Sequence, residues 1–162
     1  MKFDSEDKQK YFDQVVNKIK NGATHNYILT GKTGRGKTYL ATEIAKQFNG
    51  RVMFVPELLS KMKQAMLKYN DYSPVRFVSK RTKPNVIVLD DFGGRKPTEW
   101  EIDQLFRILE YKKAIYIITT NLRSDELAEL FGDRILSRVL ENMDKTDVYK
   151  AQGNDRRLKM KF

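Results

Sequence analysis

The eight residues GKTGRGKT, which begin at Gly31, contain three glycines, two lysines and two threonines. Gly31, Gly34 and Gly36 let the backbone adopt conformations that other residues avoid, and they let it approach a ligand closely. Lys37 and Thr38 then open a helical pattern, and the first N–H groups of a helix have no partner within that helix. A loop of this composition, between an apolar run and a helix, is suited to bind phosphate.

The spacing of the loop is G-x-x-x-x-G-K-[ST], the Walker A pattern. In this pattern backbone N–H groups surround the phosphates, Lys37 reaches the β- and γ-phosphates, and the Thr38 hydroxyl ligates Mg²⁺. The alternative is a glycine-rich turn that only caps a helix, but the four fixed positions would match by chance in well under about 1% of chains of this length. The residues expected to contact ATP or ADP are Gly31, Thr33, Gly34, Arg35, Gly36, Lys37, Thr38 and Tyr39.

Two carboxylates follow an apolar run in NVIVLDDFG. Asp90 ends the run, and open α/β sheets bind ligands at the carboxyl ends of their strands, so Asp90 is expected to complete a magnesium site with Thr38. Asp91 stands where a glutamate often polarises the attacking water. Because aspartate is one methylene shorter, hydrolysis is expected to be slow. Either aspartate is alternatively a simple helix or turn cap.

Polar and basic side chains follow later in the chain. Asn121 ends the apolar run IITTN and is a candidate to orient the water or contact the γ-phosphate, although polar residues at a strand end are also ordinary loop chemistry. Arg134 and Arg138 in GDRILSR lie four residues apart and therefore share a helical face. They form either a solvated stripe or a pair that reaches the nucleotide of an adjacent subunit, where an arginine stabilises transition-state charge.

The composition favours a polyanionic partner. The 162 residues carry 31 Lys plus Arg against 21 Asp plus Glu, a formal net charge of +10, with no cysteine for disulfides or thiolate metal sites. A solvated basic surface is the plainer alternative. Single-stranded DNA contacts are expected from Arg76, Phe77, Lys80, Arg81 and Lys83, where basic groups surround an aromatic ring. Phe77 is equally a candidate for the core.

The sequence also indicates the cellular compartment of the protein. No apolar run approaches the roughly 18 residues of a membrane span, and the first residues lack the apolar stretch of a signal peptide. A cytoplasmic protein without membrane contact is expected. The lone His25 lacks a second histidine or cysteine, so it is expected to be a surface or capping residue.

Strand and helix patterns alternate along the chain. Apolar residues at helical spacing predict a helix over residues 5–20, another after the glycine-rich loop, another from Pro56, and further helices in TEWEIDQLFRILEYKK, SDELAELFG and DRILSRVLENM. Strands are predicted at NYILT, RVMFV, NVIVLD and AIYIITTN, with strand-like alternation in the tail. Such alternation implies a parallel sheet with helices on both faces.

Taken together, the segments GKTGRGKTYLA, VIVLDDFG, IITTN, LFGDRILSRVL and GNDRRLK resemble AAA+ ATPases, in the branch of the DnaC/DnaI helicase loaders and the IstB transposition ATPases. The resemblance implies one AAA+ domain over residues 1–162, with an N-terminal helix in 1–22 and a basic tail in 145–162. It implies a three-layer α/β sandwich whose five parallel strands are ordered 5-1-4-3-2, without a helical lid. Family loaders carry an N-terminal partner-binding domain, whereas here barely twenty residues precede the first strand.

The resemblance also implies roles for single residues. Lys37 and Thr38 would form Walker A, Asp90 and Asp91 Walker B, and Asn121 sensor 1. Arg134 would be the arginine finger, with Arg138 as second candidate, and Arg157 would be a late sensor-like arginine beside the nucleotide. The implied partners are single-stranded DNA, a replicative helicase or another replication or transposition protein, and further copies of the chain assembled by ATP.

The predicted function is therefore a slowly hydrolysing, Mg²⁺-dependent ATPase that acts as a helicase-loader-like protein in DNA replication. An IstB-like transposition helper, and a non-catalytic adaptor or inhibitor that only binds ATP, are the alternatives. A small-molecule P-loop kinase is less consistent with the sequence, since no arginine-rich substrate lid follows the third helix.

Overall fold

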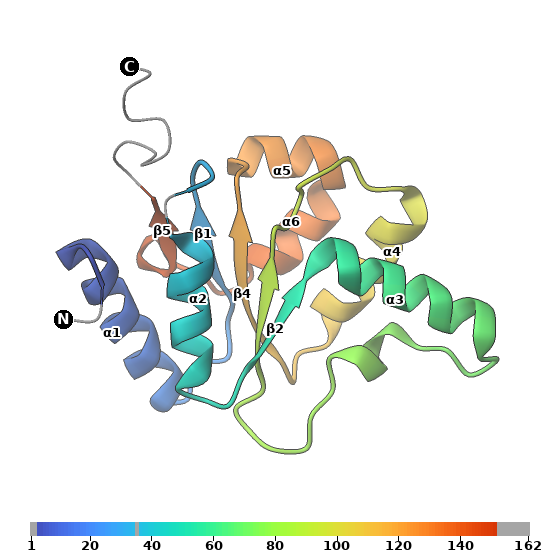
Figure 1. Cartoon of the computed structure of the whole chain (residues 1–162), viewed down its shortest axis with the longest axis horizontal. Helices are drawn as coiled ribbons and strands as arrows, with labels where there is room; N and C mark the ends of the chain where they lie inside the picture. Colours follow the sequence, from blue (N-terminus) through green and yellow to red (C-terminus); the bar gives the residue numbers. More distant parts are fainter. Residues whose placement is uncertain (1–2, 35, 152–162) are drawn as a thin grey trace.

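The computed structural model describes residues 3–34 and 36–151, which form alternating strands and helices (Figure 1). The strands are β1 (Tyr27–Thr30), β2 (Arg51–Phe54), β3 (Val86–Asp90), β4 (Ile115–Thr120) and β5 (Val148–Lys150). The α-helices are α1 (Glu6–Lys20), α2 (Lys37–Lys46), α3 (Val55–Lys68), α4 (Glu99–Glu110), α5 (Ser124–Phe131) and α6 (Asp133–Leu140). Two short 3₁₀ helices are η1 (Pro74–Phe77) and η2 (Lys145–Asp147).

The five strands form one sheet in the order β2-β3-β4-β1-β5 with all neighbours parallel. This confirms the predicted order 5-1-4-3-2. The register pairs Thr30 with Thr120 and Leu89 with Ile118, so β1, β3 and β4 end at the same edge of the sheet. The loops that follow these three strands therefore lie together, and they carry the residues predicted to bind nucleotide (Figure 1).

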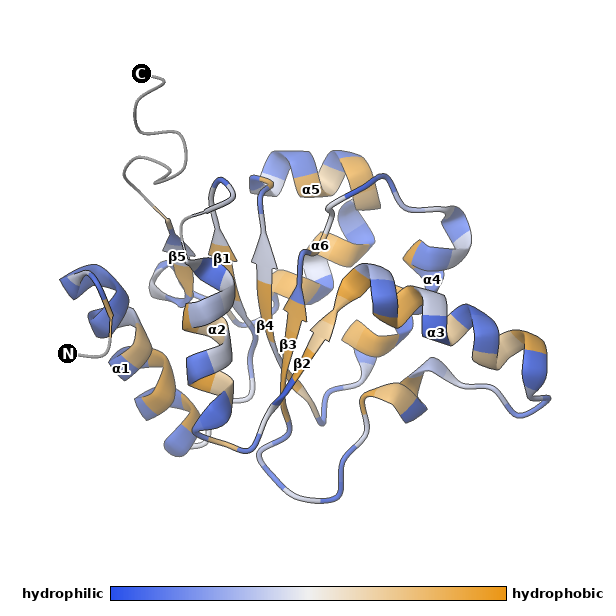
Figure 2. Cartoon of the chain, in the orientation of Figure 1, coloured by the Kyte–Doolittle hydropathy of each residue, from blue (hydrophilic) through white to orange (hydrophobic). Residues whose placement is uncertain are grey.

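Helices cover both faces of the sheet in two separate hydrophobic clusters. Helices α1 and α2 pack on one face, against side chains such as Val86 and Val88. Helices α3 to α6 pack on the other face, against side chains such as Ile87 and Leu89. Successive side chains of a strand point to opposite faces and both faces of β3 are covered, which is why its first four residues, VIVL, are all apolar (Figure 2). Among the described residues, no helix is both long and apolar enough to cross a membrane.

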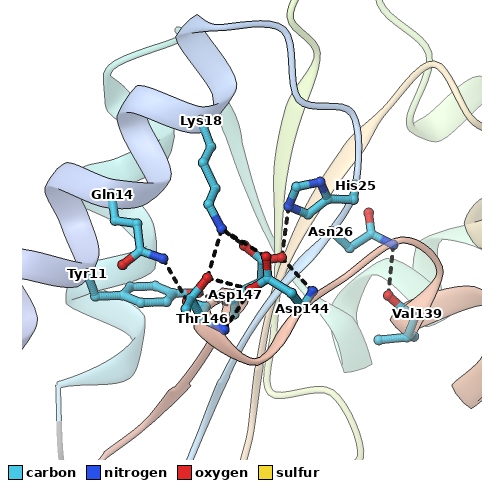
Figure 3. Close-up of polar contacts among 9 residues, drawn as sticks. All are labelled: Tyr11, Gln14, Lys18, His25, Asn26, Val139, Asp144, Thr146 and Asp147. Atoms are coloured by element: carbon cyan, nitrogen blue, oxygen red, sulfur yellow. Dashed lines mark hydrogen bonds and ion pairs between the residues drawn. The ribbon is translucent and has the colours of Figure 1, made fainter.

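A buried carboxylate joins the beginning of the chain to the last strand (Figure 3). Asp147, whose side chain is fully buried, lies 2.6 Å from Lys18 Nζ and 3.0 Å from His25 Nε2. The neighbouring Tyr11 hydroxyl donates to the Asp147 backbone carbonyl at 2.7 Å. Burial, and then the charge of Asp147, raise the pKa values of Tyr11 and Tyr27 well above their usual range, so both phenols stay protonated.

The placement of His25 corrects the expectation of a surface or capping residue. Its side chain is only 16% exposed and lies 3.0 Å from the Asp147 carboxylate, in the cluster that also contains Lys18. Its partner lies more than 120 residues away in the sequence, and no local pattern indicates such a pair. The cluster fixes η2 and β5 against α1 and β1.

Candidate functional site

The glycine-rich loop follows β1 and uses its glycines as the sequence predicts. Gly31, Gly34 and Gly36 have φ angles of +133°, +86° and +79°, in the region that favours glycine. Gly31 also has no room for a side chain, because a Cβ there would lie 2.8 Å from the Cβ of Ala151. Gly36 is the N-cap of α2, so the free N–H groups of this helix open onto the loop. Arg35 lies outside the described residues.

Lys37 points into the loop. Its side chain is buried, and Nζ donates to the carbonyl oxygens of Gly31 at 2.6 Å and Lys32 at 2.9 Å. These bonds hold the ammonium group within the ring of backbone formed by the loop. A phosphate bound by the loop would meet the ammonium there.

Two hydroxyl groups converge on one oxygen of Asp90. Thr38 Oγ1 donates to Asp90 Oδ1 at 2.8 Å, and Thr119 Oγ1 donates to the same atom at 2.6 Å. The structure thus brings together the Thr38 and Asp90 that were predicted as a metal pair. Thr119 was missed as a site residue, although the polar ending of IITTN marked it as unusual.

The ends of β3 and β4 are joined by side-chain hydrogen bonds in addition to the backbone hydrogen bonds of the sheet. The backbone N–H of Asp91 donates to Thr119 Oγ1 at 3.0 Å, and Thr120 Oγ1 donates to the carbonyl of Phe92 at 2.7 Å. Both threonines are buried. Thr119 is therefore a bridge that fixes the Asp90 carboxylate and the turn after β3 together.

The carboxylate of Asp91 does not join the Asp90 cluster. Asp91 has a φ angle of +61°, and its carboxylate lies so close to Gly94 that any Cβ at Gly94 would overlap it. It lines a pocket of about 20 Å³ with the N-terminus of α3 and the start of α4. There the Arg95 guanidinium binds both oxygens of Glu101, at 2.9 and 2.6 Å, and lowers the pKa of that carboxyl.

Asn121 lies over the glycine-rich loop. Its Nδ2 donates to Thr33 Oγ1 at 3.0 Å, and the pair is exposed. The structure thus brings Asn121 to the loop predicted to bind phosphate, one residue beyond the end of β4.

The N-terminal segment also reaches the loop, which the sequence did not indicate. Lys8 Nζ lies 3.0 Å from the position that a Cβ on Gly36 would occupy, and it pairs with Asp4 at 2.8 Å. The ring of Phe3 packs against Tyr39 with 5.7 Å between ring centroids. Tyr39, predicted to contact the nucleotide, is 54% exposed beside these residues.

The two arginines of α6 have different surroundings. Arg138 lies 3.9 Å from Glu110 of its own chain. Arg134 is exposed, and its guanidinium carbon lies 3.9 Å from the ring centroid of Phe106 on α4. Of the two finger candidates, Arg134 is therefore the more exposed. Arg157 lies outside the described residues.

The residues predicted to bind DNA are only partly available. Arg76 pairs with Asp71 at 2.8 Å, and Lys80 donates to the Asn49 carbonyl at 2.9 Å. Arg81 and Lys83 are exposed. Phe77 is half-buried and packs against the cluster beneath α3 and α4, as the core alternative predicts.

An exposed aromatic ring lies at the end of α3. Tyr69, just beyond this helix, is 54% exposed, and Lys68 Nζ lies 5.4 Å from its ring centroid. Leu67 beside it is 76% exposed. Tyr69 therefore places an open ring beside a basic group, whereas Phe77 is half-buried.

The donor set around Asp90 fits Mg²⁺ held together with a nucleotide. Among the described residues, no group of three or more His, Cys, Asp or Glu side chains could hold a metal ion by itself. Mg²⁺ in nucleotide sites uses one or two protein oxygens, with water and phosphate oxygens completing the shell. The Thr38 hydroxyl and the Asp90 carboxylate, 2.8 Å apart beside the loop, provide such a pair.

This site and fold define a class. A glycine-rich loop between β1 and α2, an aspartate at the end of β3 and a parallel sheet in the order 5-1-4-3-2 are the features of a P-loop ATPase of the AAA+ type. Residues 5–162 match the family described as IstB-like ATP binding protein, and the chain belongs to this family.

Solved structures agree with this class. The DnaC helicase loader is similar with a TM-score of 0.76 and 21% identity, over 91% of this chain and 92% of that one. DnaI has a TM-score of 0.71 and 19% identity, over 93% and 87% of the two chains. The replication initiator DnaA bound to AMPPCP and single-stranded DNA has a TM-score of 0.68 and 17% identity, over 90% of this chain and 45% of that one. A search of curated proteins found no match.

Proposed function

We propose that this protein binds Mg·ATP, hydrolyses it slowly, and assembles in the ATP-bound state on single-stranded DNA or a replicative helicase, as a helicase-loader-like protein. The observation that carries the proposal is the convergence of the Thr38 and Thr119 hydroxyls on Asp90, next to the loop that surrounds Lys37. This arrangement places two ligands for one Mg²⁺ ion, a loop of backbone N–H groups that can bind phosphate, and the Lys37 ammonium group within one site.

The chemistry assigned to each residue follows from phosphoryl transfer, in which a protein contributes mainly position and charge stabilisation. Lys37 would exchange its carbonyl partners for β- and γ-phosphate oxygens. Thr38 and Asp90 would hold Mg²⁺, which neutralises charge on those oxygens when it is bound. Asn121, one hydrogen bond away from the loop, would orient the attacking water.

Assembly of several copies would supply the remaining catalytic group, an arginine from a neighbouring copy. Arg134 is exposed and belongs to α6, whereas the glycine-rich loop precedes α2. Its assigned role is to reach the γ-phosphate bound by the next copy. An arginine supplied in this way raises turnover by about 10³- to 10⁵-fold, so an isolated copy is expected to hydrolyse ATP very slowly.

We assign DNA binding to exposed residues at the end of α3 and in the loop before β3. Arg81 and Lys83 would neutralise phosphates, and Tyr69 offers a ring on which a base could stack. The formal net charge of +10 supports a polyanionic partner. Single-stranded DNA is bound by a DnaA structure with the same fold.

Fluorescence anisotropy of a labelled single-stranded oligonucleotide tests the proposal. The protein is titrated with Mg·ATP, with Mg·ADP and without nucleotide. Tight, cooperative binding is expected with Mg·ATP alone, and Arg134→Ala is expected to remove the cooperativity. If about four phosphates are neutralised, the slope of log affinity against log salt is near −3. Binding that is absent or indifferent to nucleotide would overturn the DNA-assembly part of the proposal.

One observation favours a second candidate, an adaptor or inhibitor that binds ATP without hydrolysing it. The Asp91 carboxylate lies against Gly94 rather than beside Asp90, so it is not placed to activate a water. Phosphate release at high protein concentration with saturating DNA separates the two functions. Steady release that Lys37→Ala abolishes supports the ATPase, whereas ATP binding without release supports the adaptor.

A further inference from the structure

We propose that Phe106 is a positioning residue that holds Arg134 in the orientation required to reach the nucleotide of a neighbouring copy. The proposal rests on the proposed function, because it assumes that Arg134 acts between subunits. It starts from the stack of the Arg134 guanidinium on the Phe106 ring, with 3.9 Å between the guanidinium carbon and the ring centroid. Phe106 is half-buried on α4, so its own place is fixed by the hydrophobic cluster that it contacts.

Helices α4 and α6 face each other through two residues each. Phe106 and Glu110 are four residues apart on α4, and Arg134 and Arg138 are four residues apart on α6, so each pair lies on one helical face. Both guanidinium carbons lie over the Phe106 ring, at 3.9 Å for Arg134 and 5.4 Å for Arg138. Arg138 in addition lies 3.9 Å from the Glu110 carboxylate and lines a pocket of about 70 Å³. Glu110 therefore neutralises Arg138, whereas the closer contact of Arg134 is with the uncharged ring.

The stack has a specific consequence for the arginine. An aromatic face fixes the plane of a guanidinium group but does not occupy its N–H donors, which lie in that plane. Within residues 3–34 and 36–151, Arg134 has no carboxylate or carbonyl partner. The ring contact thus fixes the group while its N–H donors remain unengaged by the described residues, so they are open to an anion of a neighbouring copy. A carboxylate in place of Phe106 would compete with that anion.

Mixed-subunit turnover tests the proposal, because it separates the copy that supplies the arginine from the copy that binds ATP. Lys37→Ala copies cannot hold the phosphates but still supply Arg134, and Arg134→Ala copies bind ATP but supply no arginine. ATP hydrolysis, measured with saturating single-stranded DNA, is expected in the mixture and not in either variant alone. Phe106→Leu, which keeps an apolar side chain but removes the ring, is then added to one kind of copy at a time.

In the Lys37→Ala copy, Phe106→Leu is expected to lower kcat of the mixture by about 3- to 30-fold, the range that a lost cation–π stack implies. Phe106→Tyr in the same copy keeps the ring and is expected to retain the rate. In the Arg134→Ala copy, Phe106→Leu is expected to leave kcat and KM of the mixture unaltered.

Three outcomes would overturn the proposal. An equal loss from either copy would show that Phe106 supports the fold rather than Arg134, and thermal unfolding of each double variant would show the same. An unaltered rate in both arrangements would show that the stack is not used. A mixture that is inactive even with Phe106 intact would refute the role of Arg134 itself, which is a failure of the proposed function and is recognised before Phe106 is changed.

Discussion

Replacement of Thr119 by valine removes one hydroxyl group and changes little else, because the two side chains have nearly the same shape. The hydroxyl donates to Asp90 at 2.6 Å and accepts the N–H of Asp91 at 3.0 Å, and the residue is only 2% exposed. The variant therefore loses a hydrogen bond to a charged group and leaves a backbone donor without its partner.

The magnitude follows from these two contacts. A hydrogen bond to a charged group contributes about 1.5–3 kcal/mol, and an unpaired buried donor costs about 1–3 kcal/mol. Asp90 is half-exposed and keeps its bond from Thr38, so water and Thr38 offset part of the loss. We expect a destabilisation of about 2 kcal/mol, which lowers Tm by about 4–8 °C in a domain of this size.

Binding of Mg·ATP should respond more strongly than stability. Partners that orient a metal-binding carboxylate typically contribute 10- to 100-fold to metal affinity. We expect Thr119→Val to raise the Kd of Mg·ATP by about 10- to 100-fold and to leave ATP binding in EDTA unchanged. Both are measured by calorimetry, with Thr119→Ser as the matched control that keeps the hydroxyl.

Two results would refute this reasoning. If Thr119→Val and Thr119→Ser weaken Mg·ATP equally, the hydroxyl is not what positions Asp90. If Thr119→Val lowers Tm but affects ATP to the same extent with and without Mg²⁺, Thr119 maintains the sheet edge and has no part in the metal site.

Three further predictions concern separate parts of the molecule. Asn121→Ala should reduce kcat by about 10²-fold while stability stays within about 0.5 kcal/mol, since the side chain is exposed; a Tm shift as large as that of a core variant would contradict this. The pKa of Glu101 is lowered by Arg95, so its ionised form stabilises the fold above a pH of about 4.5 and this contribution is lost as the pH falls; Glu101→Gln should therefore flatten the acid side of the stability profile. Lys18→Met deprives buried Asp147 of its ammonium partner and should cost about 3 kcal/mol in urea unfolding at unchanged m, whereas a loss below 0.5 kcal/mol would argue against the ion pair.

Much of the fold was predictable because local physics and global packing agree. The VIVL segment of β3 is entirely apolar because both faces of the strand are covered, and a run of this kind is visible in the sequence alone. The order of the strands was different, because no periodicity encodes it. It came from resemblance to a known family. Strand β5 showed only a weak alternation of apolar and polar residues, because it contains just three residues and lies at the edge of the sheet.

The geometry of the candidate nucleotide site was predictable where a residue type and a fixed spacing impose it. Lys37, Thr38 and Asp90 fall in this class, and the structure places them as expected. The orientation of Asp91 could not be predicted in this way. Asp91 lies just beyond β3 with a φ of +61°, so its side chain follows the geometry of a turn rather than the alternation of a strand.

Other contacts were beyond single-sequence reasoning because their partners are distant along the chain. Lys8 reaches Gly36 and Thr119 reaches Asp90 only after the sheet has formed. His25 shows the same limit, since an isolated histidine gives no sign of a buried aspartate more than 120 residues later. Such pairs depend on tertiary packing rather than on local pattern.

The position of β1 between β4 and β5 has a consequence for synthesis on the ribosome. Both strands that flank β1 are made after it, and β5 follows about 120 residues later. At about 5–20 residues per second this delay is roughly 6–24 s. During that time the edge of β1 that pairs with β5 has no hydrogen-bond partner. Lys18 and His25 likewise lack their contact with Asp147, which has not yet been synthesised. The glycine-rich loop, which extends directly from β1, therefore gains its contact with Ala151 only after about 120 further residues have been made.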